Sequence, residues 1–176
     1  MEQVRLPLFF VFMAVILRVM PHIPNIAPVI GIGLFCGATL PKRWAPLAAV
    51  SAMAAGDLLL GWIPEHLFGW AAVALSAGIG FLLRKRRTVA GVVGCSALAS
   101  TLFFLLSNFG VWLFGCGKGY YPADAGGLAA CYAAGIPFYR NGLIGDVLYT
   151  AILFGGYELL NRWITHRSAA AVAASK

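Results

Sequence analysis

The stretch SNFGVWLFGCGKGYYPADAGGLAACYAAGIPFYRNGLIGD, residues 107–146, predicts most about the fold of this chain. It lies between two long apolar runs and contains most of the unusual polar residues. Its first residues close the earlier run, and its last residues, from Arg140 to Asp146, open the later one. A glycine-rich segment with tyrosines and cysteines lies between them. The pattern predicts the outward-facing mouth of a small membrane protein.

The composition supports that class. The chain has 176 residues, of which 61% are hydrophobic and 11% are charged, and its mean hydropathy is +0.84. Soluble domains carry roughly 25% charged residues, so a chain this apolar needs lipid as its solvent. The net charge of +7 fits cationic loops that set membrane topology better than it fits nucleic-acid binding. We therefore expect a single all-α, polytopic domain over residues 1–167, followed by a flexible cytoplasmic tail at 168–176.

Six apolar runs predict six transmembrane helices, because a bilayer core needs about 17–25 apolar residues per span. Breaks rich in proline or charge separate them, such as Pro21 to Asn25. The runs are Leu6–Met20, Ile26–Leu40, Trp44–Trp62, Leu67–Leu83, Thr88–Phe114 and Gly142–Ile164. Leu128–Phe138 is too short to span, and we interpret it as a re-entrant or interfacial segment in the last outer loop.

The positions of the basic residues predict the orientation, since Lys and Arg are enriched in cytoplasmic loops. With six spans, ten of the 13 fall on one side: Arg5, Lys42, Arg43, Arg84, Lys85, Arg86, Arg87, Arg162, Arg167 and Lys176. Arg18, Lys118 and Arg140 fall on the other side. Both termini are then cytoplasmic, and the expected location is a bacterial inner membrane.

Polar residues from several runs converge at the outer level of this topology. A charged group at membrane depth costs roughly 2.5–3.5 kcal/mol, so such groups pair or bind something. The candidate substrate-binding residues are Arg18, Asn25, Asp57, Asn108, Trp112, Tyr121, Tyr132, Arg140, Asn141 and Asp146. Helical geometry places Asn141 in the loop, as a cap or ligand contact, and Asp146 on the helix proper.

Two interpretations of these residues stay open at this point. Asp57 and Asp146 could form internal salt bridges with Arg18 and Arg140 that lock the helices together. Alternatively, these groups line a pocket that opens to the outside, since uncharged hydrogen-bonding groups gather at the same depth. Near the inner surface, Glu158 is expected to pair with Arg162 four residues later.

The outer cysteines and the absence of known motifs add two expectations. Cys116 and Cys131 lie on one outer loop, where a disulfide is possible in an oxidising compartment. The chain shows no metal-binding spacing, Walker A motif, GxSxG elbow or convincing nucleophile–base pair. We therefore predict no catalytic residue, no bound metal and no cofactor, and an energised transporter would need its motor from another chain.

Four motifs carry a resemblance to known proteins. They are R-x-x-P-x-x-P-N-x-x-P from Arg18 to Pro28, G-D at Gly56–Asp57, S-N-F-x-V-W from Ser107 to Trp112, and G-L-x-x-C-Y-x-x-x-I-P-F-x-R-N-x-L-x-G-D from Gly127 to Asp146. Together they resemble a family of uncharacterised bacterial six-helix membrane proteins. That family looks like the substrate-binding S components of energy-coupling-factor vitamin transporters.

This resemblance implies a subunit that captures a small organic micronutrient from the outer side for uptake. A coupling protein and ABC ATPases would act in trans, with the lipid bilayer as solvent and no nucleic acid involved. The loop from Gly115 to Phe138 would close over the ligand. The alternative is a structural or assembly subunit of a larger membrane complex, whose outer polar loop docks a partner.

Overall fold

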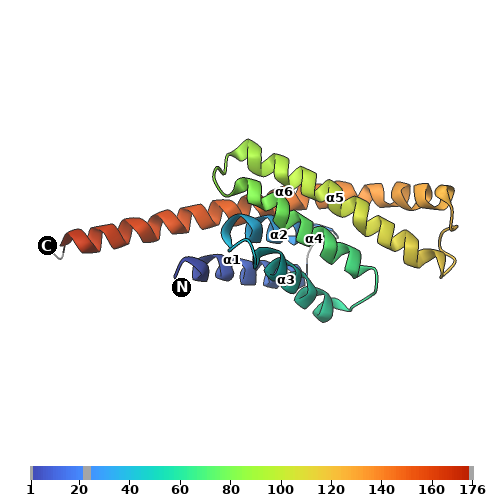
Figure 1. The fold of residues 1–176 in the computed structure, drawn as a ribbon, viewed down its shortest axis with the longest axis horizontal. Helices are drawn as coiled ribbons and strands as arrows, with labels where there is room; N and C mark the ends of the chain where they lie inside the picture. Colours follow the sequence, from blue (N-terminus) through green and yellow to red (C-terminus); the bar gives the residue numbers. More distant parts are fainter. Residues whose placement is uncertain (1, 22–24, 175–176) are drawn as a thin grey trace.

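The computed structural model describes residues 2–21 and 25–174, and within these ranges the chain is all-helical. The break between the first two helices, expected at 21–25, lies partly outside the described residues. Figure 1 shows an elongated bundle whose last helix continues well beyond the others. Six α-helices and one 3-10 turn follow in order: α1 Glu2–Val19, α2 Val29–Thr39, α3 Ala45–Leu60, α4 His66–Gly80, η1 Phe81–Leu83, α5 Val89–Cys116 and α6 Ala125–Ala174.

Helix α2 is the centre of the bundle, and it contacts each of the other five α-helices. Its sequence, VIGIGLFCGAT, carries no charged residue, and every residue from Ile30 to Ala38 is buried. With 11 residues it is about 16 Å long, roughly half the thickness of a bilayer core. The large side chains of Ile30 and Phe35 are completely enclosed. The other α-helices therefore pack around this short apolar helix.

Small residues allow α2 and α4 to approach closely. Gly33 and Gly37 of α2 face Ser76, Ala77 and Gly80 of α4. A Cβ at Gly37 would overlap the carbonyl oxygen of Ala77, and one at Gly80 would overlap that of Leu34. Such four-residue spacing of small residues is the usual means by which membrane helices pack backbone to backbone.

Charged side chains from α6 and from the connection between η1 and α5 hold the two ends of α2. At its N-terminus, a carboxylate oxygen of Asp146 accepts a hydrogen bond from the Ile30 amide at 3.4 Å. At its C-terminus, Arg84 donates to the carbonyls of Gly37 and Leu40, and Arg87 donates to that of Ala38. The signs complement the helix macrodipole, which is positive at the N-terminus and negative at the C-terminus.

Glu158 of α6 is paired differently from the expectation. Its carboxylate binds Arg87, at 2.5 Å, and not Arg162 on its own helix. Arg87 therefore links α6 to the C-terminal end of α2. A contact between α6 and the connection before α5 therefore replaces the predicted contact within one helix.

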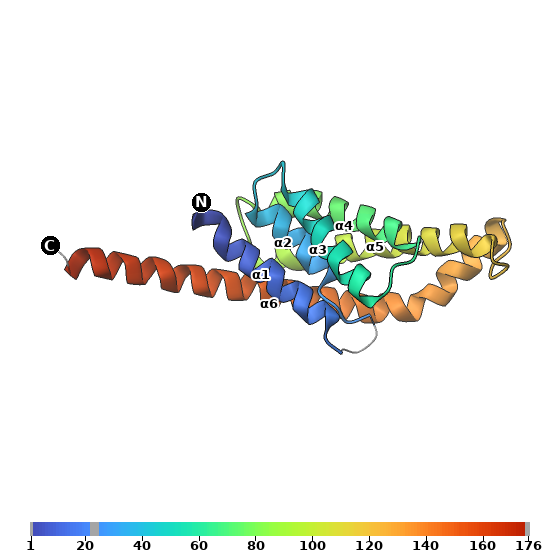
Figure 2. The ribbon, with the colours of Figure 1, turned by 90° about the horizontal axis from the view of Figure 1, so that it is seen from below.

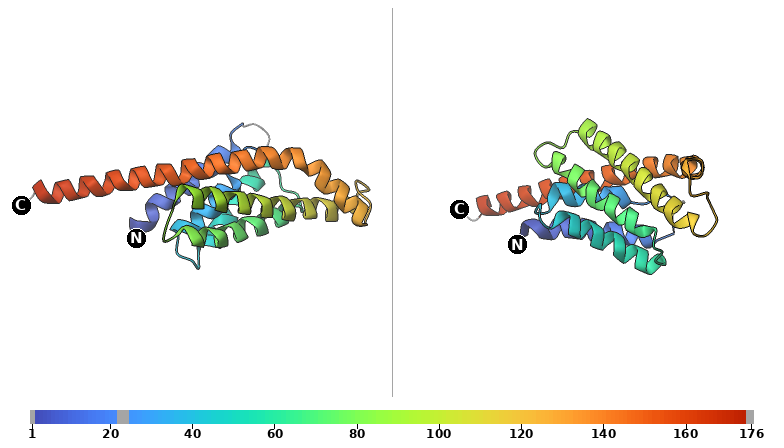
Figure 3. Two further views of the ribbon diagram at one scale, coloured as in Figure 1. Left: turned by 90° about the horizontal axis from the view of Figure 1, so that it is seen from above. Right: turned by 45° about the vertical axis from the view of Figure 1, so that its right-hand side comes forward.

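The segment Leu128–Phe138 corrects two of the expectations. It is not a separate re-entrant or interfacial segment, since it forms the first part of the continuous helix α6. The prediction that Asn141 lies in a loop is therefore wrong, because Asn141 lies inside that helix. The missing amide of Pro137 does not end the helix, and Figure 3 shows α6 bending in its orange part, where a proline kink is expected.

At 50 residues, α6 is about 75 Å long, far more than a bilayer core of about 30 Å requires. Its final part includes residues 168–174 of the expected tail, and residues 175–176 lie outside the described part of the chain. The flexibility of that tail stays a prediction. Figure 2 shows this part of α6 extending past the beginning of α1.

Three helical segments of the described chain are long and apolar enough to cross a membrane: His66–Leu83, Val89–Cys116 and Ala125–Arg167. Helices α2 and α3 are apolar but shorter. Large apolar side chains also remain exposed on the outside of the bundle, including Leu59 at 72% and Leu82 at 71%. An apolar exterior of this kind is typical of a protein that lipid surrounds, so the structure indicates a membrane protein.

The helices alternate in direction along the bundle. Helix α1 begins and α6 ends at the same end, where the α2–α3 and α4–α5 connections also lie (Figure 1). The α3–α4 and α5–α6 connections lie at the opposite end, and α5 and α6 continue past α3 and α4 there. We call this opposite end the loop end of the bundle.

Candidate functional site

A cavity of about 400 Å³ lies in the loop-end half of the bundle, beside the N-terminus of α2. Its walls come from α1, the residues before α2, and helices α2 to α6. The polar residues that line it are Arg18, Asn25, His66, Ser100, Ser107, Asn108 and Asp146, and the aromatic ones are Phe103, Phe104, Phe138 and Tyr139. Its lining passes from exposed residues such as Asn25 and Phe138 to buried ones such as Ile30, Ser100 and Asp146. The buried residues therefore form its floor.

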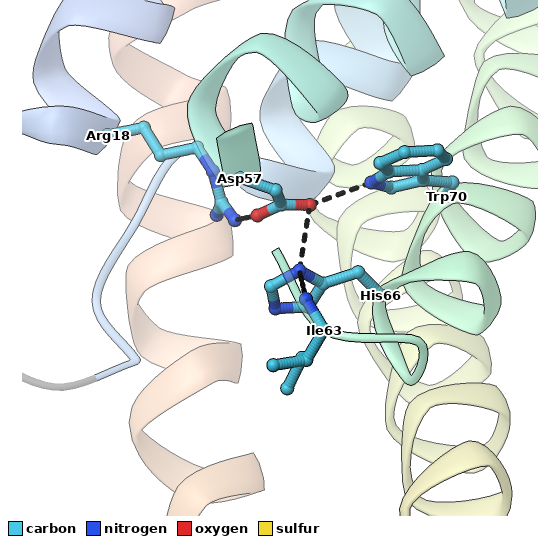
Figure 4. Close-up of polar contacts among 5 residues, drawn as sticks. All are labelled: Arg18, Asp57, Ile63, His66 and Trp70. Atoms are coloured by element: carbon cyan, nitrogen blue, oxygen red, sulfur yellow. Dashed lines mark hydrogen bonds and ion pairs between the residues drawn. The ribbon is translucent and has the colours of Figure 1, made fainter. Parts of the chain in front are cut away.

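A charged cluster borders this cavity, and Figure 4 shows its members. The carboxylate of Asp57 on α3 is fully buried and forms a salt bridge with the guanidinium of Arg18 on α1. Its second oxygen accepts a hydrogen bond of 2.7 Å from the indole nitrogen of Trp70 on α4. Asp57 thus joins three helices, and it does not itself line the cavity.

His66 is the fourth member of the cluster. Its Nδ1 lies 3.8 Å from a carboxylate oxygen of Asp57, a distance that forms an ion pair only when the imidazole is protonated. The same Nδ1 lies 3.4 Å from the backbone nitrogen of Ile63. It can accept a hydrogen bond from that amide only when Nδ1 itself carries no proton. The two contacts therefore belong to different protonation states of one ring, which lies in the cavity wall.

Gly56 explains how Arg18 reaches Asp57. A Cβ at this position would lie 2.8 Å from both Cδ and Nε of Arg18. The arginine side chain, which is 12% exposed, therefore lies across the bare backbone of α3. The Gly56–Asp57 dipeptide works as one unit, in which the glycine makes room for the cation that the aspartate binds.

Asp146 has different partners. One carboxylate oxygen accepts from the hydroxyl of Ser100 on α5, and the other accepts from the Ile30 amide at the start of α2. The residue is 6% exposed and lines the floor of the cavity. Among the described residues it makes no salt bridge, since Arg140 is exposed on α6 and lies outside the cavity wall.

The structure brings four of the ten predicted binding residues into the cavity wall: Arg18, Asn25, Asn108 and Asp146. Asn108 also packs against α6, because a Cβ at Gly135 would overlap its side-chain oxygen. Asp57 stands behind Arg18, and Arg140 and Asn141 do not belong to the wall. The binding role of each residue stays a prediction.

The three remaining aromatic candidates fasten the α5–α6 hairpin and do not line the cavity. The indole nitrogen of Trp112 donates to the carbonyl of Pro122 at 3.0 Å, and the hydroxyl of Tyr132 donates to that of Leu105 at 2.8 Å. The ring of Tyr121 packs on Gly115. These contacts hold the loop and the two helix ends together in the segment expected to act as a lid.

The two outer cysteines are free thiols in the structure. The thiol of Cys116 lies 3.6 Å from the carbonyl oxygen of Pro122, and that of Cys131 lies 3.4 Å from the carbonyl oxygen of Asn108. Cys131 is buried between α5 and α6. A disulfide between them stays a prediction for the oxidised protein.

An ion pair joins two connections at the loop end. Lys118, after α5, donates to the carboxylate of Glu65, before α4, at 2.8 Å. This hydrogen bond lowers the pKa of Glu65 and raises the pKa of Lys118. Half of the Lys118 side chain is exposed, so salt screens the pair.

Sequence reasoning did not propose Ser100, Ser107 or His66 as binding residues. The sequence does contain a signal for Ser100. Ser96 and Ser100 are four residues apart, and so are Asp146 and Thr150. Residues spaced by four share one face of a helix. In the structure, Ser96 and Thr150 lie 3.4 Å apart, one turn below the contact between Ser100 and Asp146. The matched spacing indicates a row of polar contacts between α5 and α6.

The chemistry of this site suits binding. Hydrogen-bonding groups and aromatic rings converge on one cavity whose volume falls within the usual range for small-molecule sites, about 300–1,000 Å³. Within the described chain, no three His, Cys, Asp or Glu side chains are grouped so that they could hold a metal ion.

The fold and the cavity define an all-helical protein of membrane type with a polar site inside an apolar bundle. The chain belongs to the family described as "Family of unknown function (DUF6580)", whose model matches residues 1–170. No curated protein and no solved structure matches it.

Proposed function

We propose that this protein is a membrane-embedded binding subunit that captures a small organic micronutrient from the outer side for uptake, in the manner of an S component. One observation carries the proposal: a cavity of about 400 Å³ with charged, amide and hydroxyl groups lies within an apolar bundle. Buried polar groups are costly in lipid, and they mark substrate sites in many membrane proteins. A coupling protein and ABC ATPases would supply the energy in trans.

The proposal includes a topology of six crossings in a bacterial inner membrane, with both termini in the cytoplasm. The alternation of the helices supports it, as does the position of Lys42, Arg43 and Arg84–Arg87 in connections at the end where α1 begins and α6 ends. The cavity then faces outward. An impermeant thiol reagent applied to intact cells should label a cysteine introduced at Glu65 and spare one at Lys85. Labelling at Lys85 alone, or at both positions, contradicts this topology.

Native mass spectrometry of the protein in lipid nanodiscs tests the binding function. A co-purifying small molecule is expected on the wild-type protein. Ser107→Phe, which fills the cavity wall, should remove it. Ser51→Phe is the matched control, because Ser51 is exposed on α3, away from the cavity. A molecule retained equally by both variants would place its binding elsewhere.

A second candidate is a structural or assembly subunit of a larger membrane complex. Its support is the final part of α6, which extends past the bundle in Figure 2. The same helix also exposes the large apolar side chains of Leu159, Trp163 and Ile164. Fixed protein partners after mild solubilisation, with no bound small molecule, would favour this candidate over the first.

A further inference from the structure

We infer that the cavity takes a small planar ligand with a positively charged nitrogen, which binds the carboxylate of Asp146 while its ring lies against Phe104 and Tyr139. The inference rests on the proposed function and specifies the chemical class of its substrate.

The charges around the cavity provide the first argument. Arg18 is the permanent cation in its wall, and the Asp57 carboxylate already neutralises it. Asp146 has only neutral donors, the Ser100 hydroxyl and the Ile30 amide. When Asp146 is ionised and His66 is neutral, the cavity and the cluster behind it carry a net charge of −1, from Arg18, Asp57 and Asp146 together. A cation is the ligand charge that balances this site.

The N-terminus of α2 does not reverse this preference. A helix N-terminus attracts anions through its free amides and carries the equivalent of about half a positive charge. Here the Ile30 amide already donates to Asp146, and Pro28, just before the helix, has no amide hydrogen. An anion in the cavity would also face the Asp146 carboxylate, so the charge of the site disfavours it.

Asp146 retains capacity for a further donor. An ionised carboxylate offers about four lone-pair positions on its two oxygens. One position on each oxygen is taken, by Ile30 and by Ser100 respectively. The residue contributes to the cavity floor, where an ammonium or protonated ring nitrogen could donate to the remaining positions.

The aromatic wall supplies the second half of the site. The rings of Phe104 and Tyr139 lie with centroids 4.7 Å apart and planes tilted by 37°. The Tyr139 hydroxyl lies 2.8 Å from that of Thr101 on α5, which fixes the ring. Aromatic faces attract cations and stack on planar groups. A carboxylate on the floor and rings on the wall together match a charged nitrogen attached to a flat ring.

Three indole compounds of different charge test the inference on the wild-type protein in phosphatidylcholine nanodiscs at pH 7.5. They are tryptamine, a cation, tryptophol, which is neutral, and indole-3-acetate, an anion. Calorimetric titration should give tryptamine a Kd at least 10-fold lower than that of tryptophol, with no saturation by indole-3-acetate. Tighter binding of the neutral compound or the anion overturns the inference, whereas the proposed function stands.

Variants assign the preference to Asp146. Asp146→Asn should bring the two Kd values of tryptamine and tryptophol within about twofold of each other. Asp124→Asn is the control, because Asp124 is exposed before α6 and accepts from the Gly127 amide, a role that asparagine also fills. A cation preference that survives in Asp146→Asn overturns the inference. If that variant does not fold, the ratio measured on the wild-type protein still decides.

If none of the three compounds binds, the molecule released from the native protein decides. A cationic nitrogen in that molecule supports the inference, and its absence overturns it. If no compound binds and no molecule is released, both the inference and the proposed function fail.

Discussion

Asp57 on α3 is fully buried and Asp146 on α6 is nearly so, but the two carboxylates have different kinds of partner. Asp57 has a guanidinium and an indole around it, so its charge is neutralised where it lies. Asp146 has a hydroxyl and a backbone amide, and part of it faces a cavity. The Asp57 cluster connects helices, while the Asp146 carboxylate keeps unused acceptor positions at the floor of the cavity.

The largest effect is expected when the Asp57 cluster is broken. Asp57→Asn leaves the Arg18 guanidinium buried without its carboxylate, which typically costs 3–5 kcal/mol. Reversible unfolding in mixed detergent micelles measures the loss. Adding Arg18→Met should recover part of it, because the stranded charge is then removed. A double variant as unstable as the sum of the two single variants would show that the ion pair is not the cause.

A smaller loss is expected at Gly56, where only the position of Arg18 is disturbed. Gly56→Ala places a methyl group 2.8 Å from Cδ and Nε of Arg18, and overpacking of this kind costs about 1–3 kcal/mol. Gly78→Ala is the matched control in the same unfolding assay, because a Cβ there meets nothing within 4 Å. It should be neutral or slightly stabilising. Equal losses at both glycines would remove the special role of Gly56.

Asp146→Asn should cost about 1 kcal/mol, since the amide oxygen can still accept one of the two hydrogen bonds and no cation is stranded. Unfolding and ligand affinity are measured on the same preparation. We expect a folded variant whose affinity for a cationic ligand is weakened to that for a neutral one. Full affinity combined with a loss as large as that of Asp57→Asn would make Asp146 a second structural carboxylate.

The smallest effect is expected at the exposed ion pair between Glu65 and Lys118. The hydrogen bond from Lys118 lowers the pKa of Glu65. The pair therefore stabilises the folded protein at pH values above the pKa of an unfolded glutamate, about 4.3. This stabilisation disappears as the pH falls through the lowered pKa of Glu65. Lys118→Met should therefore reduce the thermal midpoint slightly at pH 7 and low salt. At 1 M salt the variant and the wild type should coincide. A difference that persists in high salt would point to lost packing instead of lost charge.

Much of the fold follows from local features of the sequence. The apolar runs predict the helices, and five of the six runs have boundaries near those of α1 to α5. The sixth run was placed too late along the chain, because the segment before it is short and interrupted by Pro137. A proline inside a helix is tolerated where neighbouring structure supports the bend, and that support comes from packing against α5, which local sequence does not describe.

The sequence by itself determined that this chain is apolar and helical, and that its polar residues gather toward the level where the cavity lies. Only the tertiary structure decided which of them meet. In a soluble protein, the polar face of each helix shows which side is exposed, but lipid is as apolar as a helix interface, so the pattern loses that information. Arg18 and Asp57 are 39 residues apart, and Ser100 and Asp146 are 46 apart. The packing of α1 on α3 and of α5 on α6 gave one carboxylate a cation and left the other at the wall of a cavity.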